Sequence, residues 1–308
     1  MNYVVIVGGV NTDIQGFPKQ ELVAKDSNIG NVKVSLGGVG RNIAENLVRL
    51  GVKTRLISVL GDDLYGEAVL ANGKALGLNM DDTLILSGEA TSIYLSILDK
   101  SGDMELAISS MDIFDNLDID FIESKRAIIE SSKLCIIDAN ILKDTIEYMV
   151  TKFKGVDFFL DTVSTAKTKK IKDLIGNFHT IKPNELEAEI LTGIKISNDN
   201  DLIKASNILH EKGVKKVFIT LGEKGVFYSD GEIQNHLLSP KIKVTNATGA
   251  GDAFVAALAY GYMKDIRIDE VAKLAMYASI VALSYEDTIN KNMSIKEIES
   301  KMEELKQC

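Results

Sequence analysis

The residues best suited to chemistry lie in the stretch NATGAGDAF, where small residues and one carboxylate precede an apolar run with helical spacing. Gly249, Ala250 and Gly251 would leave the first backbone N–H groups of a helix free to bind an anion. Thr248 is placed to cap that helix, whose dipole adds positive charge at this end. Asp252 would then lie where a base could take a proton from a hydroxyl group.

An ordinary helix start is the alternative interpretation of this stretch. A first-turn Asp stabilises a helix by under about 1 kcal/mol without any catalytic role. That alternative does not explain why Gly249 and Gly251 are both present. The chain lacks the G-x-x-x-x-G-K-[ST] pattern, so a phosphate site here would not be a P-loop.

A second glycine loop, SLGGVGRN, also precedes a helical pattern. Gly37, Gly38 and Gly40 permit close approach of the backbone to a ligand, and Arg41 and Asn42 add polar reach. The last glycine of a dinucleotide-binding fingerprint is missing, which disfavours a nicotinamide-dependent dehydrogenase. A tight turn into a helix is the structural alternative for these glycines.

Composition and charge exclude several functions. The net charge of −9 over 308 residues disfavours broad nucleic-acid binding. No apolar stretch is long enough to span a membrane and no leader pattern precedes the first strand, so we expect a cytoplasmic protein. None of the three histidines lies beside a nucleophile signature. Cys135 lies in an apolar run and is interpreted as core, and Cys308 as a tail residue.

The order of the elements predicts an α/β fold. Short β-branched runs alternate with amphipathic stretches, which indicates a doubly wound, mainly parallel sheet flanked by helices. Residues 90–110 alternate around DKSGD like a β-hairpin. We therefore expect one domain over residues 1–308, with an accessory sheet formed by about 12–36 and 90–111.

Six motifs occur in the order and spacing of one known family. They are GGVNTD (8–13), GGVGRN (37–42), GDDLYG (61–66), KPNELEAE (182–189), TLGEKG (220–225) and TGAGDAF (248–254). The chain resembles the ribokinase-like, or PfkB-type, carbohydrate kinases. The resemblance implies a ribokinase-like fold in which the accessory sheet is a lid. It also implies transfer of the γ-phosphoryl group of ATP, with Mg²⁺, to a hydroxyl group of a small sugar or nucleoside.

The resemblance also assigns residues to the substrates. Asp252 would be the base, opposite an anion hole formed by residues 249–251. Asn184 and Glu187 would place Mg²⁺ through water, although a helix N-cap followed by a first-turn Glu explains them nearly as well. The residues implied for the acceptor are Asn11, Asp13, Gly38, Asn42, Met111 and Asp112. Those implied for the nucleotide are Asn184, Thr220, Gly222, Gly225 and Thr248.

Finer features favour one branch of the family. Many members have Asp-Thr-Thr where this chain has Asn246, Ala247 and Thr248, which leaves a potassium site open to question. The form N-x-T-G-A-G-D resembles the pseudouridine kinase branch, as do DTVSTAK (161–167) and SSMDIFDNL (109–117). We therefore expect phosphorylation of the 5′-hydroxyl of pseudouridine.

Other functions and assemblies remain open at this point. A ribokinase, fructokinase or ribonucleoside kinase fits the same motifs, and a catalytically silent nucleoside-binding sensor is a further alternative. Residues 284–290 fall where family members place a loop near the adenine and the cation. An accessory sheet with one open face would need covering, so a homodimer through the lid is expected.

Overall fold

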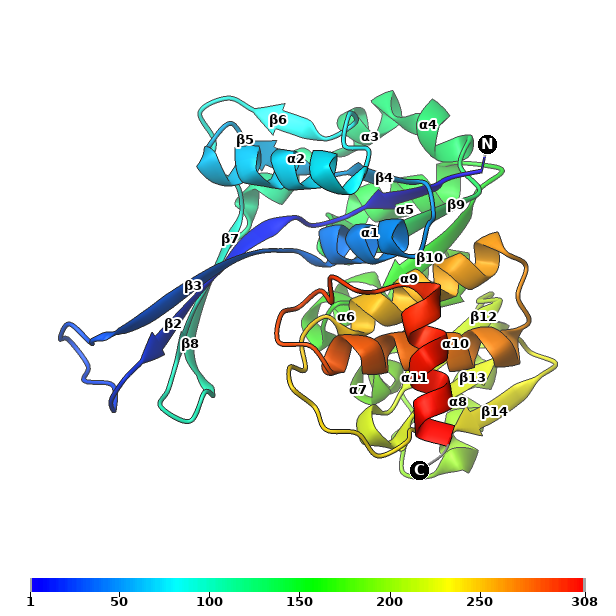
Figure 1. Cartoon of the computed structure of the whole chain (residues 1–308). Helices are drawn as coiled ribbons and strands as arrows, with labels where there is room; N and C mark the ends of the chain where they lie inside the picture. The colour runs from blue at the N-terminus through cyan, green and yellow to red at the C-terminus, as the bar shows by residue number, and fades with distance from the viewer. Residues whose placement is uncertain (1, 307–308) are drawn as a thin grey trace.

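A computed structural model describes residues 2–306, so the interpretation of Cys308 lies outside the described residues. An eight-stranded sheet forms the centre of the molecule, in the order β14-β13-β12-β11-β10-β9-β1-β4 (Figure 1). Along this order, neighbouring strands from β12 to β4 pair in parallel. At the other edge β13 pairs antiparallel with both β12 and β14. The strands are β1 (Val4–Val7), β4 (Thr54–Ile57), β9 (Leu134–Asp138), β10 (Asp157–Asp161), β11 (Thr180–Ile181), β12 (Lys216–Thr220), β13 (Val226–Ser229) and β14 (Gln234–Leu237).

Helices cover both faces of this sheet, and each face has its own hydrophobic cluster. One layer contains α1 (Val39–Arg49), α2 (Leu64–Leu76), α9 (Ala250–Met263), α10 (Ile268–Leu283) and α11 (Ile295–Lys306). The other contains α3 (Ile119–Ser124), α4 (Arg126–Glu130), α5 (Lys143–Lys152), α6 (Thr165–Ile171), α7 (Glu185–Thr192) and α8 (Asp199–Glu211). Within residues 2–306, 3₁₀ turns also connect elements: η1 (Asp112–Asn116), η2 (Lys172–Asn177) and η3 (Gly222–Lys224). The predicted doubly wound fold is confirmed.

The alternation of residues in the strands explains the two clusters. Val4 and Ile6 of β1 face the α9 side, whereas Val5 and Val7 face the α5 side. Both faces of the sheet are covered here, so the central strand β1 is apolar at every position. Cys135 of β9 is fully buried in the second cluster, as predicted for a core residue.

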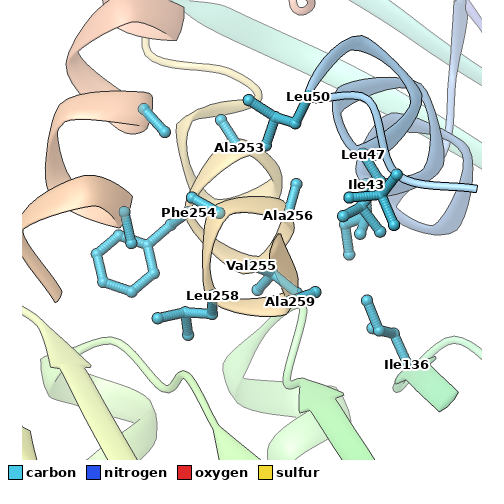
Figure 2. Close-up of a cluster of buried hydrophobic side chains, with 14 of the residues drawn as sticks. Ile43, Leu47, Leu50, Ile136, Ala253, Phe254, Val255, Ala256, Leu258 and Ala259 are labelled. Carbon is cyan, nitrogen blue, oxygen red and sulfur yellow. The ribbon is translucent and has the colours of Figure 1, made fainter. Parts of the chain in front are cut away.

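Helix α9 is buried almost all round. Its alanines let neighbouring helices approach closely, and Ile43 and Leu47 of α1 lie beside it (Figure 2). Phe254 packs edge-on against Phe218 of β12. Because packing fixes α9 against α1 and the sheet, the first turn of α9 has a defined position. No helix within residues 2–306 has the length and apolarity needed to cross a membrane.

The accessory sheet projects from this body as an arm, in the order β3-β2-β7-β8 (Figure 1). Its strands are β2 (Asn11–Pro18), β3 (Gly30–Gly37), β7 (Ile93–Leu98) and β8 (Met104–Ser110). A separate pair, β5 (Val59–Gly61) and β6 (Leu84–Leu86), lies beside α2. The structure therefore contains the small accessory sheet that the sequence predicts.

The two faces of the accessory sheet differ in polarity. The register pairs Ile14 of β2 with Val34 and Leu95, and Leu95 pairs in turn with Ile108. Asp13 lies on the opposite face. Val34 and Ile108 are 53% and 57% exposed, so the apolar side is uncovered. We call this surface the apolar face; it comprises Ile14, Val32, Val34, Leu95, Ile97, Leu106 and Ile108.

Candidate active site

The candidate site lies at the carboxyl edge of the central sheet. Asp138 ends β9, Asp161 ends β10 and Lys182 directly follows β11. Ligands of open α/β sheets bind at this edge, where the ends of parallel strands meet. The first turns of α1 and α9 meet at the same place, because Asn42 of α1 contacts Asp252 of α9.

The start of α9 differs in one detail from the prediction. The helix begins at Ala250, and its N-cap is Gly249 with φ 81° and no side-chain cap. The prediction that Thr248 caps the helix is wrong, because its backbone N and Oγ1 instead donate to Oδ1 of Asn246 at 2.9 and 2.7 Å. A Cβ at Gly249 would overlap the backbone carbonyl of Thr288. This position therefore requires glycine for its conformation and for space.

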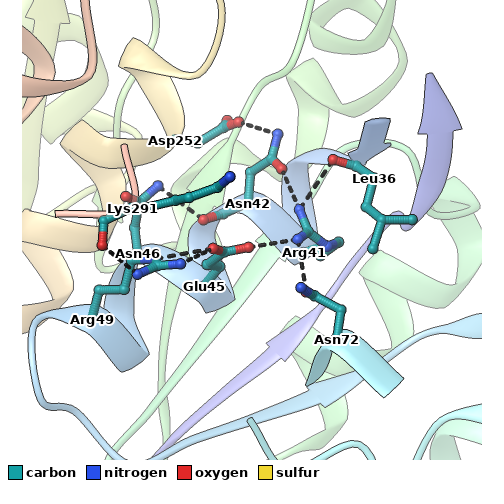
Figure 3. Close-up of polar contacts among 9 residues, drawn as sticks. All are labelled: Leu36, Arg41, Asn42, Glu45, Asn46, Arg49, Asn72, Asp252 and Lys291. Carbon is teal, nitrogen blue, oxygen red and sulfur yellow. Dashed lines mark hydrogen bonds and ion pairs between the residues drawn. The ribbon is translucent and has the colours of Figure 1, made fainter. Parts of the chain in front are cut away.

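Asp252 is a buried carboxyl group in the first turn of α9. Its side chain accepts a hydrogen bond from Nδ2 of Asn42 at 2.9 Å (Figure 3). Burial raises the pKa of Asp252 to about 7, and the nearby Asp161 acts in the same direction, while Asn42 and Lys182 oppose the shift. A pKa near neutrality suits a group that accepts a proton at neutral pH.

Lys182 provides a buried positive charge at the same point. Its Nζ lies 3.5 Å from Oδ2 of Asp161, and a Cβ on Gly251 would come within 3.2 Å of it. Burial alone would lower the pKa of the Lys182 amine, but Asp161, Glu187 and Asp252 raise it above its usual value. Lys182 is therefore a cation, and together with the N–H groups of the helix start it fits a phosphoryl group.

Asp138 supports the loop after β1. It is fully buried and accepts hydrogen bonds from the backbone N of Gly9 at 2.7 Å and of Asn140 at 2.9 Å. Burial raises its pKa. Sequence reasoning gave no site role to Asp138, Asp161 or Lys182. One feature of the sequence could have indicated them: each is a charged residue at the end of an apolar run that predicts a strand.

The glycines of the second loop have structural reasons for being small. Gly38 has φ 97°, and a Cβ there would overlap the carbonyl of Gly9. A Cβ at Gly40 would meet the backbone of Gly8 at 2.7 Å. The turn interpretation therefore accounts for these two glycines, and a direct contact of Gly38 with substrate stays a prediction.

The predicted acceptor residues divide into two groups. Nδ2 of Asn11 donates to Oδ1 of Asp13 at 2.6 Å, and burial raises the pKa of Asp13. Both lie where β2 leaves the body, next to Gly37, which leads into the helix that carries Asn42. Met111 directly follows β8 and packs against the core, and Asp112 is exposed at the start of η1. A role of Met111 and Asp112 at a nucleobase stays a prediction.

Four of the predicted nucleotide residues, Asn184, Thr220, Gly222 and Gly225, lie at or after the ends of β11 and β12, whereas Thr248 precedes α9. Asn184 and Glu187 form a capping box at the start of α7, and Oε2 of Glu187 also accepts from Thr162 at 2.6 Å. The helix-cap alternative thus accounts for their contacts. Thr220 pairs with Asn184 in an isolated β-bridge, and Gly222 and Gly225 follow with positive φ.

The residues present fit a nucleoside triphosphate with its magnesium. No three His, Cys, Asp or Glu side chains within residues 2–306 are grouped so that they could hold a metal ion. Mg²⁺ usually binds proteins through one or two carboxylates, with phosphate and water completing its shell. Asn184 and Glu187 would contribute in this way, beside the cationic helix start.

The loop after α10 lies against the helix start. Backbone N of Thr245 donates to the carbonyl of Leu283 at 2.8 Å, and Nδ2 of Asn246 donates to the carbonyl of Glu286 at 3.0 Å. Oγ1 of Thr248 lies 3.3 Å from Oγ1 of Thr288. The structure therefore places residues 283–288 beside residues 246–251, which we call the anion loop.

The chain combines a doubly wound fold with an anion loop at a helix start, a buried lysine and an aspartate whose pKa is about 7. This combination is that of a small-molecule phosphotransferase. The pattern of the pfkB family of carbohydrate kinases matches residues 1–295, and the chain belongs to this family. It is a sugar or nucleoside kinase, an enzyme that transfers a phosphoryl group to an alcohol.

Individual relatives span nearly the whole chain. The pseudouridine kinase of Escherichia coli is 38% identical over 98% of this chain and 97% of its own length. A crystal structure from Clostridium perfringens, described as that of a sugar kinase, is 42% identical with a TM-score of 0.91, covering 99% and 96% of the two chains. A protein described as Ribokinase II from E. coli, solved with ATP and Mg²⁺, shares the fold at 20% identity and a TM-score of 0.84, covering 99% and 100%.

Proposed function

We propose that this kinase transfers the γ-phosphoryl group of ATP to the 5′-hydroxyl of pseudouridine. The observation that carries the kinase chemistry is the buried Asp252, whose pKa is raised to about 7 beside an anion loop. The acceptor rests on the 38% identity to a pseudouridine kinase and on the branch-specific motifs at residues 109–117, 161–167 and 246–252.

In the proposed reaction, the acceptor hydroxyl loses its proton to Asp252 as its oxygen attacks the γ-phosphorus. The bond between that phosphorus and the bridging oxygen breaks, and ADP leaves. The N–H groups of residues 249–251 and the Nζ of Lys182 stabilise the charge on the transferred group. Bound Mg²⁺ would neutralise charge on the β- and γ-phosphates. Asn184 and Glu187 would hold it through water.

Asn11, Asp13 and Asn42 are the proposed acceptor-binding side chains. A carboxylate and two amides offer directed donors and acceptors to the vicinal hydroxyls of a ribose. Asp13 lies on the polar face of the accessory sheet and Asn42 lies at the start of α1, so a sugar held between them would lie near Asp252. Gly38, Met111 and Asp112 complete this proposed site.

A sugar kinase is the second candidate, and the 42% identity to the C. perfringens protein favours it. Ribose, fructose and ordinary nucleosides present similar hydroxyl pairs to Asn11 and Asp13. A silent nucleoside-binding sensor would have no need of a base and a buried cation, and the chain retains both in Asp252 and Lys182.

An ADP-release screen tests the proposal. Pseudouridine, uridine, adenosine, ribose and fructose are each supplied with ATP and Mg²⁺, with and without potassium. The highest kcat/KM for pseudouridine is the expected result. A higher value for another compound overturns the acceptor and leaves the kinase assignment. Binding of a nucleoside without release of ADP would favour the sensor.

We also propose that a second copy of this chain covers the apolar face of the accessory sheet. The strands alternate so that seven apolar side chains gather on the side away from Asp13. A sheet face of this kind is uncommon on a monomer. An isologous contact would bury the same side chains of both copies and remove the exposed apolar surface.

A further inference from the structure

Arg41 is the most enclosed cation near the site that the proposed mechanism does not use. Only 6% of the residue is exposed, and its guanidinium has four acceptors around it (Figure 3). Nη2 donates to Oε2 of Glu45 at 2.5 Å and to Oδ1 of Asn72 at 2.9 Å. Nη1 donates to the carbonyl of Leu36 at 3.2 Å and to Oδ1 of Asn42 at 3.3 Å.

The contact with Asn42 determines which way its amide faces. A guanidinium has donors and no acceptor, so only the carbonyl oxygen of the amide can face Arg41. Nδ2 then faces the opposite way and donates to Oδ2 of Asp252 at 2.9 Å. With the amide turned over, its oxygen would face the carboxylate and this hydrogen bond would be lost.

Glu45 keeps the guanidinium in place. It is buried and bridges two arginines of α1, accepting from Arg41 through Oε2 and from Arg49 through Oε1 at 2.9 and 2.6 Å. Arg49 also donates to the carbonyl of Lys291, and none of its hydrogen bonds within residues 2–306 reaches Asn42 or Asp252. Arg41 and Arg49 therefore share a partner and differ in their relation to the site.

We propose that Arg41 is a positioning residue, which orients the amide of Asn42 so that it donates to Asp252. The inference rests on the proposed function in that Asp252 is the base. Other charged groups also face this carboxylate: Asp138 from β9, Asp161 from β10 and Lys182 after β11, with Glu187 acting on Lys182. Arg41→Lys leaves all of them unchanged.

The test measures the pKa of Asp252 directly, by carbon-13 NMR of protein labelled at aspartate, with Asp252→Asn to assign the signal. Arg41→Lys keeps a cation beside Glu45 but cannot also reach Asn42. Loss of a hydrogen bond to a carboxylate raises its pKa, here by about one unit. The matched control, Arg49→Lys, should leave the pKa of Asp252 unchanged.

A double-mutant cycle shows whether the effect passes through Asn42. In an Asn42→Ala background, Arg41→Lys should cause no further shift. An equal shift with and without Asn42, or no shift in Arg41→Lys, overturns the proposal. Arg41→Gln, a neutral variant that also keeps a donor, should shift the pKa in the same direction. Circular dichroism confirms that each titrated variant is folded.

Kinetics provide a second readout. With the pKa of Asp252 raised from about 7 to about 8, kcat of Arg41→Lys should fall about fivefold at pH 7 and recover at pH 9. A merely structural defect would lower kcat equally at both values of pH. The NMR titration requires no substrate, so it still decides the role of Arg41 if the proposed acceptor or reaction is wrong.

Discussion

Asn42 donates a hydrogen bond to Asp252 across 210 residues of sequence, and this contact joins the first turns of α1 and α9. One helix follows the accessory sheet and the other carries the anion loop. The pair therefore connects the proposed acceptor-binding half of the site with the phosphoryl-binding half.

Replacing Asp252 by Asn should remove the base while keeping the size of the side chain. We expect kcat to fall by roughly two to four orders of magnitude, the contribution of a positioned base. Nucleotide binding, measured by calorimetry, should be retained because the anion loop and Lys182 are intact. Turnover close to that of the unmodified enzyme would exclude Asp252 from the mechanism.

The same substitution should stabilise the protein at high pH. In the unfolded chain an Asp titrates near its ordinary pKa of about 4, whereas Asp252 in the native state titrates at about 7. The native state binds the proton more tightly, so this carboxyl stabilises the fold at low pH and that contribution is lost as pH rises to 7. The Asp252→Asn variant has no carboxyl group at this position, so its free energy of unfolding does not fall in this way as the pH rises.

Thermal unfolding at pH 4 and pH 8 provides the measurement. The melting temperature of Asp252→Asn should exceed that of the unmodified protein by a few degrees at pH 8, since the difference reaches a few kcal/mol. The gain should be much smaller at pH 4. An equal difference at both values of pH would contradict the raised pKa.

The two glycines of the anion loop should respond differently to alanine. Gly251 lies inside α9, and outside that helix a Cβ there meets only the flexible side chain of Lys182, so Gly251→Ala should fold normally and lose activity. Gly249 has φ 81° and no room beside Thr288, so Gly249→Ala should lower the melting temperature. Melting curves and kcat for both variants test this, and wild-type kcat in Gly251→Ala would contradict the anion hole.

Asn246 should make the enzyme weakly dependent on potassium. Its Nδ2 donates to the carbonyl of Glu286, which joins the two loops without a cation. A carboxylate cannot donate, so Asn246→Asp would place two acceptors together and create a need for a cation. We expect potassium to activate the Asn246→Asp variant more strongly than the unmodified enzyme. Rates in potassium and choline chloride measure this, and equal activation of both proteins would count against it.

The proposed dimer should depend on the apolar face alone. Ile108→Asp places a charge in that face and should yield monomers in sedimentation velocity. Ser109→Asp introduces the same charge one residue later, on the opposite face of β8, and should leave the assembly unchanged. A monomeric unmodified protein, or dimers in both variants, would exclude this interface.

Much of the fold could be predicted because its signals are local. The alternation of strands and helices and the hairpin at DKSGD depend on short-range periodicity, and the structure has these elements. The cap at Thr248 was predicted wrongly for a local reason as well. Asn246 bonds the threonine side chain, and Gly249 adopts the left-handed conformation that starts the helix.

The partners within the site could not be predicted in this way. Lys182 gains its role from Asp161 and from the backbone of Gly251, which are distant in the chain. The raised pKa of Asp252 depends on burial, and burial is a property of the packed molecule. A single sequence shows which residues can do chemistry and leaves their mutual distances open.

The β2 strand carries Asp13 and Ile14 side by side in sequence and on opposite faces of the accessory sheet. Inserting or deleting one residue in a strand exchanges its faces. Such a change would turn the carboxylate away from the acceptor and an isoleucine toward it. This strand should therefore tolerate many substitutions during evolution and almost no change in length.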